Sequence, residues 1–153
     1  MRFTLDTNVL VYAVDRDAGD RHRMALDIAR RARGRDGVLT LQSLAELFRT
    51  LTGPKLRVAP SLAADIVQQW RDALPVVAAD EDCLTDAMDA VTHHGWSFWD
   101  AMIWATAKHN GCRLLISEDG QAGRSLGGVT IINPFAAGAD AMLEAALGPA
   151  PPG

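Results

Sequence analysis

The sequence predicts a single α/β domain in which helices flank both faces of a central parallel sheet of about four to five short strands. Short apolar segments alternate along the chain with longer segments of helical periodicity, which is the order typical of a parallel sheet. The loops between these segments are too short for a second domain, and 153 residues match the usual length of one domain. A hydrophobic content of 48% supplies enough core material and excludes wholesale disorder.

The first half of the chain begins with an apolar strand at residues 3–5 and a helix that starts near Val9. The further predicted elements are a polar-faced helix at 20–33, a strand at 38–41, a helix at 41–51, a helix from Pro60 and a strand at 75–78. Glycine marks the end of the second helix at Gly34 and, followed by proline, of the third at Gly53.

In the second half, Asp80 is placed to cap a helix that Gly95 ends. The remaining predicted elements are a helix at 97–110, strands at 113–117 and 129–132, and a helix at 139–147. Residues 148–153 are rich in Pro and Gly, which predicts a disordered tail after a domain of residues 1–147.

Composition excludes several classes of protein. A net charge of −4 excludes binding of nucleic acid by bulk charge, so any such binding needs a local patch. The longest apolar run, residues 73–79, is far shorter than the roughly 20 residues of a membrane span. Residues 1–6 end on an acid and do not resemble a signal peptide, and Cys83 and Cys112 lack metal-ligand spacing. We therefore expect a cytoplasmic protein with reduced cysteines in its core.

Acidic residues directly follow two predicted strands. Asp6 comes after the first strand, and Glu118 and Asp119 come after the strand that ends at Ser117. Ligands of open α/β sheets bind beyond the carboxyl ends of the strands, which makes these acids candidates for a site. An Asp in such places is also an ordinary helix cap or turn residue, so position alone leaves both readings open.

Two further acids lie on predicted helices. Asp100 shares a helical face with the apolar residues Ile103 and Trp104, so its carboxylate points toward a buried layer. It needs a partner there, unless its spacing from Ser97 makes it part of a capping box. Glu46 lies opposite the apolar stripe of its helix, and periodicity alone places it in solvent.

Taken together, these four acids stand in the order found in a known family. The matching segments are Leu5–Leu10, Ser43–Glu46, Trp99–Ala101 with Ala105 and Ala107, Leu115–Asp119 and Gly128–Phe135. On these segments the chain resembles the PIN-domain ribonucleases, and especially the VapC-like toxins of toxin–antitoxin pairs, over residues 1–135. The family pattern at the fourth acid is Ser or Thr, then any residue, then Asp. Ser117 and Asp119 fit this pattern, with Glu118 between them. The chain departs from the family at Ala122, where an aromatic residue is common.

The resemblance implies metal-dependent hydrolysis of RNA phosphodiester bonds. Asp6 and Asp100 would be the principal metal ligands and Glu46 and Asp119 would complete the acidic site. Thr7, Asn8 and Ser117 would hydrogen-bond the acids or a metal-bound water. Oxygen ligands without Cys or His favour Mg²⁺ or Mn²⁺ over zinc. The resemblance also implies an RNA substrate, a cognate antitoxin and a homodimer, with no membrane partner.

Other readings remain open at this stage. One alternative is a PIN-like module that binds RNA or a partner protein without cleaving it. Metal-dependent cleavage of RNA would distinguish the nuclease from this binding module. A haloacid-dehalogenase-like phosphatase needs a second Asp two residues after the first, where this chain has Asn8. An arginine-rich stretch at residues 16–35 is a candidate RNA rim or a solvated helix face, with the solvated face favoured. The aromatic residues Trp96, Phe98, Trp99 and Trp104 favour core or dimer packing over base stacking.

Overall fold

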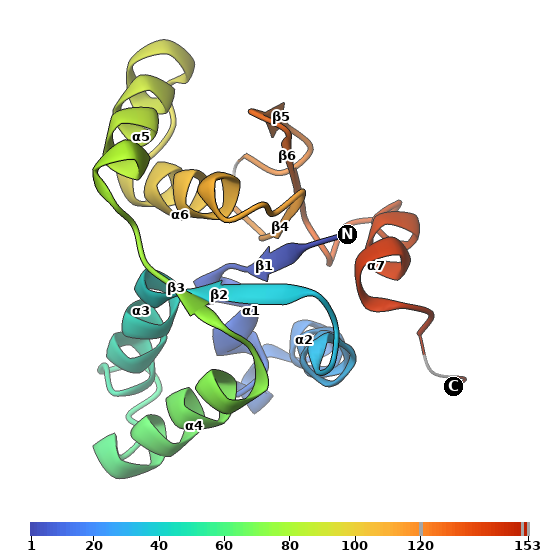
Figure 1. Cartoon of the computed structure of the whole chain (residues 1–153). Coiled ribbons are helices and arrows are strands. Elements are labelled where there is room, and N and C mark those ends of the chain that lie inside the picture. The colour runs from blue at the N-terminus through green and yellow to red at the C-terminus, as the bar shows by residue number, and fades with distance from the viewer. Residues whose placement is uncertain (120, 151, 153) are drawn as a thin grey trace.

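Six strands form one sheet at the centre of the molecule in the computed structural model, which describes residues 1–119, 121–150 and 152 (Figure 1). Across the sheet the strands are β3 (Val76–Val77), β2 (Gly37–Thr40), β1 (Phe3–Leu5), β4 (Leu114–Ile116), β6 (Val129–Ile132) and β5 (Ser125–Leu126). Every pair is parallel except β5 with β6. The predicted parallel α/β sheet is therefore confirmed.

The antiparallel edge strand β5 was not predicted. It is only two residues long, and it is joined to β6 by Gly127 and Gly128, both of which have positive φ. Two such glycines form the tight turn that a hairpin needs. This Gly-Gly pair is the sequence signal for the sixth strand, because a two-residue strand is too short to show periodicity.

The helices lie close to their predicted ranges. They are α1 (Thr7–Tyr12), α2 (Asp20–Ala32), α3 (Leu41–Leu51), α4 (Pro60–Ala73), α5 (Glu81–His94), α6 (Phe98–His109) and α7 (Asp140–Leu147), with a short 3-10 turn η1 (Arg16–Ala18) before α2. Gly95 ends α5 in the left-handed conformation, as its position in the sequence predicts.

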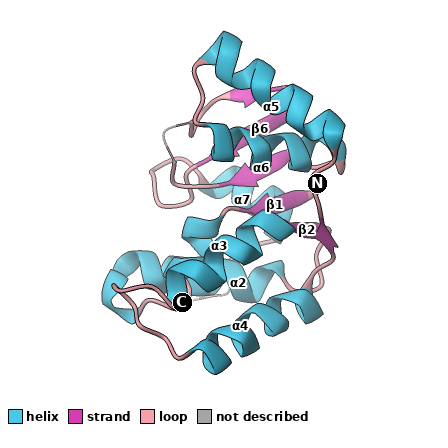
Figure 2. Cartoon of the chain, turned by 90° about the vertical axis from the view of Figure 1, so that its left-hand side faces the viewer, coloured by secondary structure: helices cyan, strands magenta, loops and turns pink. Residues whose placement is uncertain are grey.

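Alternating side chains of the strands divide the core into two layers. Leu114 and Ile116 of β4 pack with α1 to α4 and α7, whereas Leu115 between them packs with α5 and α6. Figure 1 shows α5 and α6 on one side of the sheet and α1, α2 and α4 on the other, and Figure 2 shows the same layers from the side. Helices therefore cover both faces, as expected.

The strand order reverses between β1 and β4. From β1 the chain builds the sheet outward to β2 and β3, and it then returns to place β4 on the other side of β1. The backbone N–H of Asp6, just past β1, donates to the carbonyl of Ile116 at the end of β4 over 2.9 Å. A crevice at the carboxyl ends of these two strands is the usual ligand site of open α/β sheets.

The C-terminal helix α7 packs beside α2, and Arg31 of α2 donates to the carbonyl of Gly148 just beyond α7. The disordered tail predicted at 148–153 falls partly outside the described residues, since it includes 151 and 153. No helix of the described residues is long and apolar enough to cross a bilayer. Cys83 and Cys112 are both buried and form no disulfide, and burial raises the pKa of the Cys112 thiol to about 12.

Candidate active site

Asp6 lies at the centre of the site, at the carboxyl end of β1 where α1 begins. Its Oδ1 accepts from the backbone N–H of Thr7 over 2.7 Å, which makes it the N-terminal cap of α1. Its Oδ2 accepts from the hydroxyl of Ser117 over 2.6 Å. Only 4% of Asp6 is exposed. The residue thus serves as a cap and also places a buried carboxylate in the crevice, so the two readings of the sequence are compatible.

Ser117 connects the ends of β1 and β4. It is fully buried, and while its hydroxyl donates to Asp6 it accepts from the backbone N–H of Asp119 over 3.1 Å and from the side-chain amide of Asn8 over 3.4 Å. The single hydroxyl proton and both lone pairs are therefore engaged. This network holds the Asp6 carboxylate in one orientation relative to the turn that carries Asp119.

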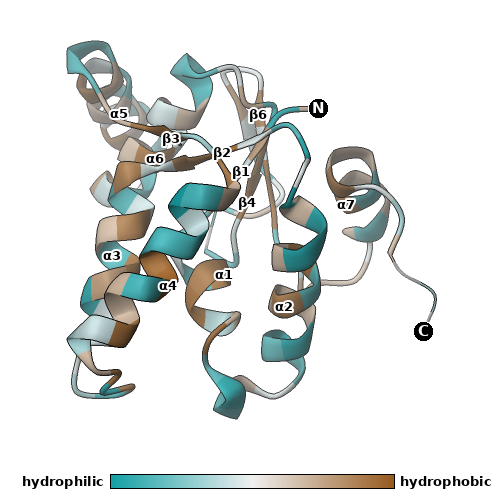
Figure 3. Cartoon of the chain, turned by 60° about the horizontal axis from the view of Figure 1, so that its bottom comes forward, coloured by the Kyte–Doolittle hydropathy of each residue, from teal (hydrophilic) through white to brown (hydrophobic). Residues whose placement is uncertain are grey.

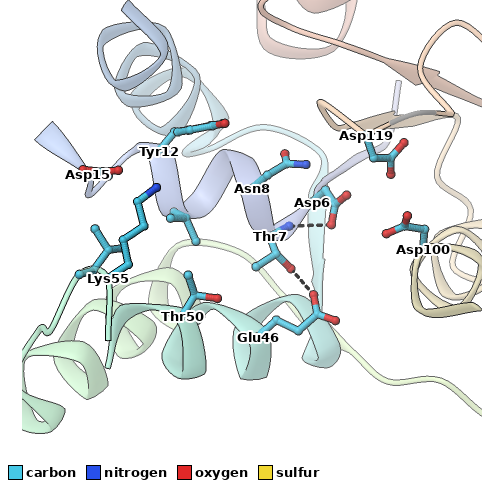
Figure 4. A pocket seen from close by; sticks show the side chains of 12 residues that line it. Asp6, Thr7, Asn8, Tyr12, Asp15, Glu46, Thr50, Lys55, Asp100 and Asp119 are labelled. Carbon is cyan, nitrogen blue, oxygen red and sulfur yellow. Dashed lines mark hydrogen bonds between the residues drawn. The ribbon is translucent and has the colours of Figure 1, made fainter. Parts of the chain in front are cut away.

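Asp100 and Asp119 approach Asp6 from two other elements. Asp100 lies in the first turn of α6, and Asp119 lies in the turn after β4, where its Oδ1 accepts from the backbone N–H of Gln121 over 2.8 Å. One carboxylate oxygen from each of Asp6, Asp100 and Asp119 lies within 4.8 Å of the others. Figure 4 shows the three carboxylates converging at one end of a pocket. The structure thus brings together three of the four acids predicted from the sequence.

Burial and mutual repulsion change the proton affinity of these acids. Burial raises the pKa of Asp6 from 3.8 to about 7; the hydrogen bonds from Ser117 and Thr7 oppose that rise, and the charges of Asp119 and Asp100 add to it. Burial and the charges of Asp119 and Glu46 also raise the pKa of Asp100. Two unit charges 4.8 Å apart repel by about 3 kcal/mol at an effective dielectric constant of about 20. A cation or a proton is needed to relieve this repulsion.

Only part of the capping box expected at Ser97 and Asp100 is present, since a hydrogen bond from Ser97 lowers the pKa of Asp100. Ser97 is the N-cap residue of α6, but its side chain makes no capping hydrogen bond. The other expectation for Asp100 agrees with the structure, since Ile103 and Trp104 on its face of α6 are both buried. The carboxylate of Asp100 faces the pocket and is half-buried.

Glu46 is half-buried, and the solvent-facing position that periodicity predicted for it is wrong. Its Oε2 accepts from the hydroxyl of Thr7 over 2.6 Å, and its Oε1 accepts from the side-chain amide of Gln42 over 2.9 Å. The reason is that the start of α1 lies against this part of α3, where Thr7 contacts Glu46. Glu46 lines the pocket beside the three-carboxylate cluster, although it is not part of the cluster.

Glu118 and Asp119 take different directions from the same turn. Glu118 accepts from the hydroxyl of Tyr12 over 2.8 Å and pairs with Arg21, whereas Asp119 faces Asp6 and Asp100. The contact with Arg21 and Tyr12 engages the Glu118 carboxylate outside the acidic cluster. Of the two candidates for the fourth acid, the geometry therefore favours Asp119.

A pocket of about 370 Å³ contains the acids and extends between α1 and α3. Its lining residues are Asp6, Thr7, Asn8, Val11, Tyr12, Asp15, Glu46, Thr50, Lys55, Leu56, Asp100 and Asp119 (Figure 4). Six of these residues were not predicted as site residues, namely Val11, Tyr12, Asp15, Thr50, Lys55 and Leu56. Tyr12 follows Asn8 by four residues on α1, and that spacing was the available signal. The segment with Lys55 and Leu56 reaches the pocket through tertiary packing and had no such signal.

Most arginines of the arginine-rich stretch are exposed, and Arg31 is the exception, since it is half-buried and contacts Gly148. Arg23 pairs with Asp20 and Arg31 pairs with Asp27, both along α2. Figure 3 colours much of α2 hydrophilic. The aromatic residues divide into two pairs: Trp96 and Trp104 are buried, in line with the predicted core packing, while Phe98 and Trp99 are 36% and 60% exposed at the start of α6.

The cluster has the donor chemistry of a divalent-cation site. Carboxylate oxygens are hard ligands, and neither His nor Cys lines the pocket. Ligand oxygens about 2.1 Å from one Mg²⁺ lie about 3.0 Å apart when adjacent and about 4.2 Å apart when opposite, so three oxygens within 4.8 Å of one another would draw closer to share an ion. Because both oxygens of Asp6 already accept one hydrogen bond each, its orientation is fixed before any ion binds.

The fold and the site define an α/β domain with an acidic, metal-type centre at the point where its strand order reverses. The family model of the PIN domain matches residues 3–124, and the chain belongs to the PIN domain family. The resemblance found in the sequence is thereby confirmed. The comparison with curated proteins found no match.

Solved structures with the same fold include toxins and toxin–antitoxin complexes. VapC20 of Mycobacterium tuberculosis, a Sarcin-Ricin loop cleaving toxin, is 21% identical with a TM-score of 0.62, over 77% of this chain and 90% of that one. VapBC-1 from nontypeable Haemophilus influenzae is 16% identical with a TM-score of 0.63, over 89% and 100%. A toxin–antitoxin complex from Klebsiella pneumoniae is 17% identical with a TM-score of 0.61, over 86% and 97%.

Proposed function

We propose that this protein is a ribonuclease that hydrolyses RNA phosphodiester bonds with Mg²⁺ or Mn²⁺, and that it is the toxin of a toxin–antitoxin pair. The observation that carries the proposal is the meeting of Asp6, Asp100 and Asp119 within 4.8 Å in a PIN domain. The similarity in fold to VapC20, which cleaves the Sarcin-Ricin loop, supports RNA as the substrate class.

In this proposal Asp6 and Asp100 are the principal metal ligands, and Asp119 and Glu46 complete the acidic site. When bound, a divalent cation supplies the positive charge that activates a water molecule for attack and offsets negative charge on the phosphate. Ser117 and Thr7 orient Asp6, and the Thr7 hydroxyl also holds Glu46 at the edge of the pocket. The acids are thus positioned by short hydrogen bonds from elements that the sheet fixes.

Cleavage of total RNA by the purified protein tests the proposal. We expect cleavage with Mg²⁺ or Mn²⁺, none in excess EDTA, and none by Asp100→Asn in either condition. Asp65→Asn is the matched control, because Asp65 is an exposed acid on α4 outside the pocket. Full cleavage in EDTA would contradict a metal-dependent reaction. RNA that binds but stays intact with both metals would instead support the non-catalytic binding module.

The charge of the pocket supports a basic segment of the antitoxin as its inhibitor. Five carboxylates line the pocket, those of Asp6, Asp15, Glu46, Asp100 and Asp119, against one lysine. An arginine or lysine side chain placed among them would gain attraction and would exclude the cation at the same time. The cognate antitoxin should therefore inhibit cleavage in competition with Mg²⁺.

An exposed apolar rim beside the site supports the proposed homodimer. Leu41 is 55% exposed, and Phe98 and Trp99 stack edge to face with centroids 4.9 Å apart. Gln42 donates to the carbonyl of Trp99 over 3.0 Å, which holds the starts of α3 and α6 together. We name Leu41, Phe98 and Trp99 the apolar rim and assign it to the contact between two copies, since exposed aromatic groups are enriched in interfaces. With RNA as its substrate, we place the protein in the cytoplasm.

A further inference from the structure

The pocket has two chemically different ends. Asp6, Asp100 and Asp119 occupy the end near the start of α1 with Glu46 beside them, and Tyr12, Asp15, Thr50 and Lys55 lie toward the other end (Figure 4). The six residues of α1 separate the two ends by about 9 Å, at about 1.5 Å per residue. The far end therefore lies beyond the reach of any group bound directly at the carboxylates.

The far end opens into a second hollow. Tyr12, Asp15, Lys55 and Leu56 also line an adjacent pocket of about 460 Å³ that extends to Arg21 and Glu118. Four shared residues make the two pockets one groove. An extended strand lying in this groove passes Lys55 after it leaves the carboxylates.

Lys55 differs from the other cations near the groove. It is the only basic residue among the twelve that line the acidic pocket. Arg21 pairs with Glu118, and Lys108, the other lysine of the chain, pairs with Asp86 over 2.8 Å. Within the described residues, Lys55 makes no ion pair. Its ammonium group is therefore available to a ligand.

The loop that carries Lys55 is held in shape on both sides of it. The backbone N–H of Arg57 donates to the carbonyl of Gly53 over 2.9 Å, and that of Val58 donates to the carbonyl of Leu51 over 2.8 Å. The neighbouring Leu56 packs against the core. A cation on such a loop loses little backbone freedom when it binds a ligand.

Asp15 is the acid on the wall that the two pockets share. Asp15 caps the 3-10 turn η1, and its Oδ1 accepts from the backbone N–H of Asp17 over 3.2 Å. Val11 and Leu56 add apolar surface to the pocket. The groove thus offers a strand an acidic metal-type centre at one end and, at the other, the ammonium group of Lys55 beside Asp15, Asp17 and the Arg21–Glu118 pair.

We propose that Lys55 binds a backbone phosphate of the RNA strand adjacent to the scissile phosphodiester. The inference rests on the proposed ribonuclease function and adds a substrate-binding residue to it. The acidic end repels the RNA backbone, so a phosphate contact elsewhere in the groove is needed to hold the strand in register. A lysine ammonium is a compact charge suited to a phosphate oxygen.

The test compares wild type, Lys55→Gln and Arg49→Gln. Arg49 is an exposed cation on α3 that does not line the pocket, so its variant removes the same charge outside the groove. Binding of a labelled 12-nucleotide single-stranded RNA of mixed sequence is measured with Mg²⁺ at 50 to 200 mM salt, in an Asp100→Asn background. Steady-state cleavage is measured in the otherwise wild-type protein. Lys55→Arg, which keeps the charge, should retain most of the binding.

Loss of one phosphate contact makes the negative slope of log K against log salt concentration shallower by about 0.7 for a single strand. The affinity ratio between wild type and Lys55→Gln should therefore be about threefold larger at 50 mM than at 200 mM salt. In cleavage, KM should rise while kcat stays near the wild-type value, because the contact is made equally before and during reaction. Arg49→Gln should match the wild type in both measurements, and all variants should share one melting temperature.

An unchanged salt slope and KM in Lys55→Gln would overturn the proposal, and so would an equal change in Arg49→Gln. The two proposals can also fail separately. If the salt dependence of RNA binding differs between the wild type and Lys55→Gln but the wild type cleaves no RNA, hydrolysis is refuted and the phosphate contact stands. If it cleaves RNA and Lys55→Gln is indistinguishable from it, the phosphate contact is refuted and hydrolysis stands.

Discussion

The buried carboxylate of Asp6 should make the metal-free protein less stable as the pH rises. Its pKa is about 7 in the fold and 3.8 in the unfolded chain, so the folded state holds a proton more tightly. The stabilisation from this proton is fully present below pH 3.8 and is lost as the pH rises through 7. With these two pKa values, protonation of Asp6 adds about 3 kcal/mol to the free energy of unfolding at pH 5 and nearly nothing at pH 8.

Asp6→Asn removes the titration and leaves a residue that can still cap α1. Thermal melts of both proteins in EDTA, at pH 5 and at pH 8, measure the effect. At about 2–4 °C per kcal/mol for a chain of this size, the melting temperature of the wild type should fall by about 5–10 °C more than that of the variant. Subtracting the two curves cancels the titration of the other groups that the two proteins share.

Asp65→Asn serves again as the control and should follow the wild type, since Asp65 is exposed. Equal pH dependence of the wild type and Asp6→Asn would refute the reasoning, because it would mean that Asp6 is charged in the metal-free fold at pH 5. At pH 8 saturating Mg²⁺ should raise the melting temperature of the wild type and barely affect that of the variant. At a hundredfold excess of Mg²⁺ over Kd, the free energy of unfolding of the wild type should rise by about 2.7 kcal/mol.

Two further predictions concern residues around the cluster. Glu46→Gln keeps a good helix former at this position and removes only the charge. It should slow cleavage in the RNA assay at least tenfold, which corresponds to about 1.4 kcal/mol in the activation barrier, and Arg49→Gln is the control. An unchanged rate would leave a site of three acids. Trp99→Ser removes the most exposed aromatic group of the apolar rim and should shift the protein from dimer to monomer in sedimentation or light scattering. The control Leu62→Ser, which changes an exposed residue of α4, should leave the dimer intact. A wild type that is already monomeric would remove the rim from the proposed contact.

Local position made three acids candidates for the site, and the resemblance to the PIN-domain ribonucleases assigned them to one site. Asp6 and Asp119 directly follow strands, and parallel strands bring their carboxyl ends to the same edge of the sheet. Asp100 was found because a carboxylate on the buried face of a helix needs a partner. These three residues are the ones that the structure gathers into the cluster.

The parts that depend on how elements pack together were not predictable in the same way. A helical wheel of α3 cannot show that the start of α1 lies beside Glu46, where Thr7 donates a hydrogen bond to its carboxylate. Lys55 lies in a loop without periodicity and reaches the pocket only because Leu56 beside it packs on the core. Helix patterns specify which face is apolar, but which neighbour covers the other face depends on tertiary contacts.

The position of Asp6 connects the stability of the fold with the chemistry of the site. A proton or a divalent cation relieves the same repulsion among Asp6, Asp100 and Asp119, so the two compete for one place. Near pH 7 the proton is held weakly enough to be displaced, because the pKa of Asp6 is about 7. A carboxylate cluster with ordinary pKa values would be charged at all physiological pH values and would strain the metal-free fold. Burial of Asp6 therefore favours its protonated form in the metal-free fold below about pH 7, and in the proposed ribonuclease a divalent cation would take the place of that proton.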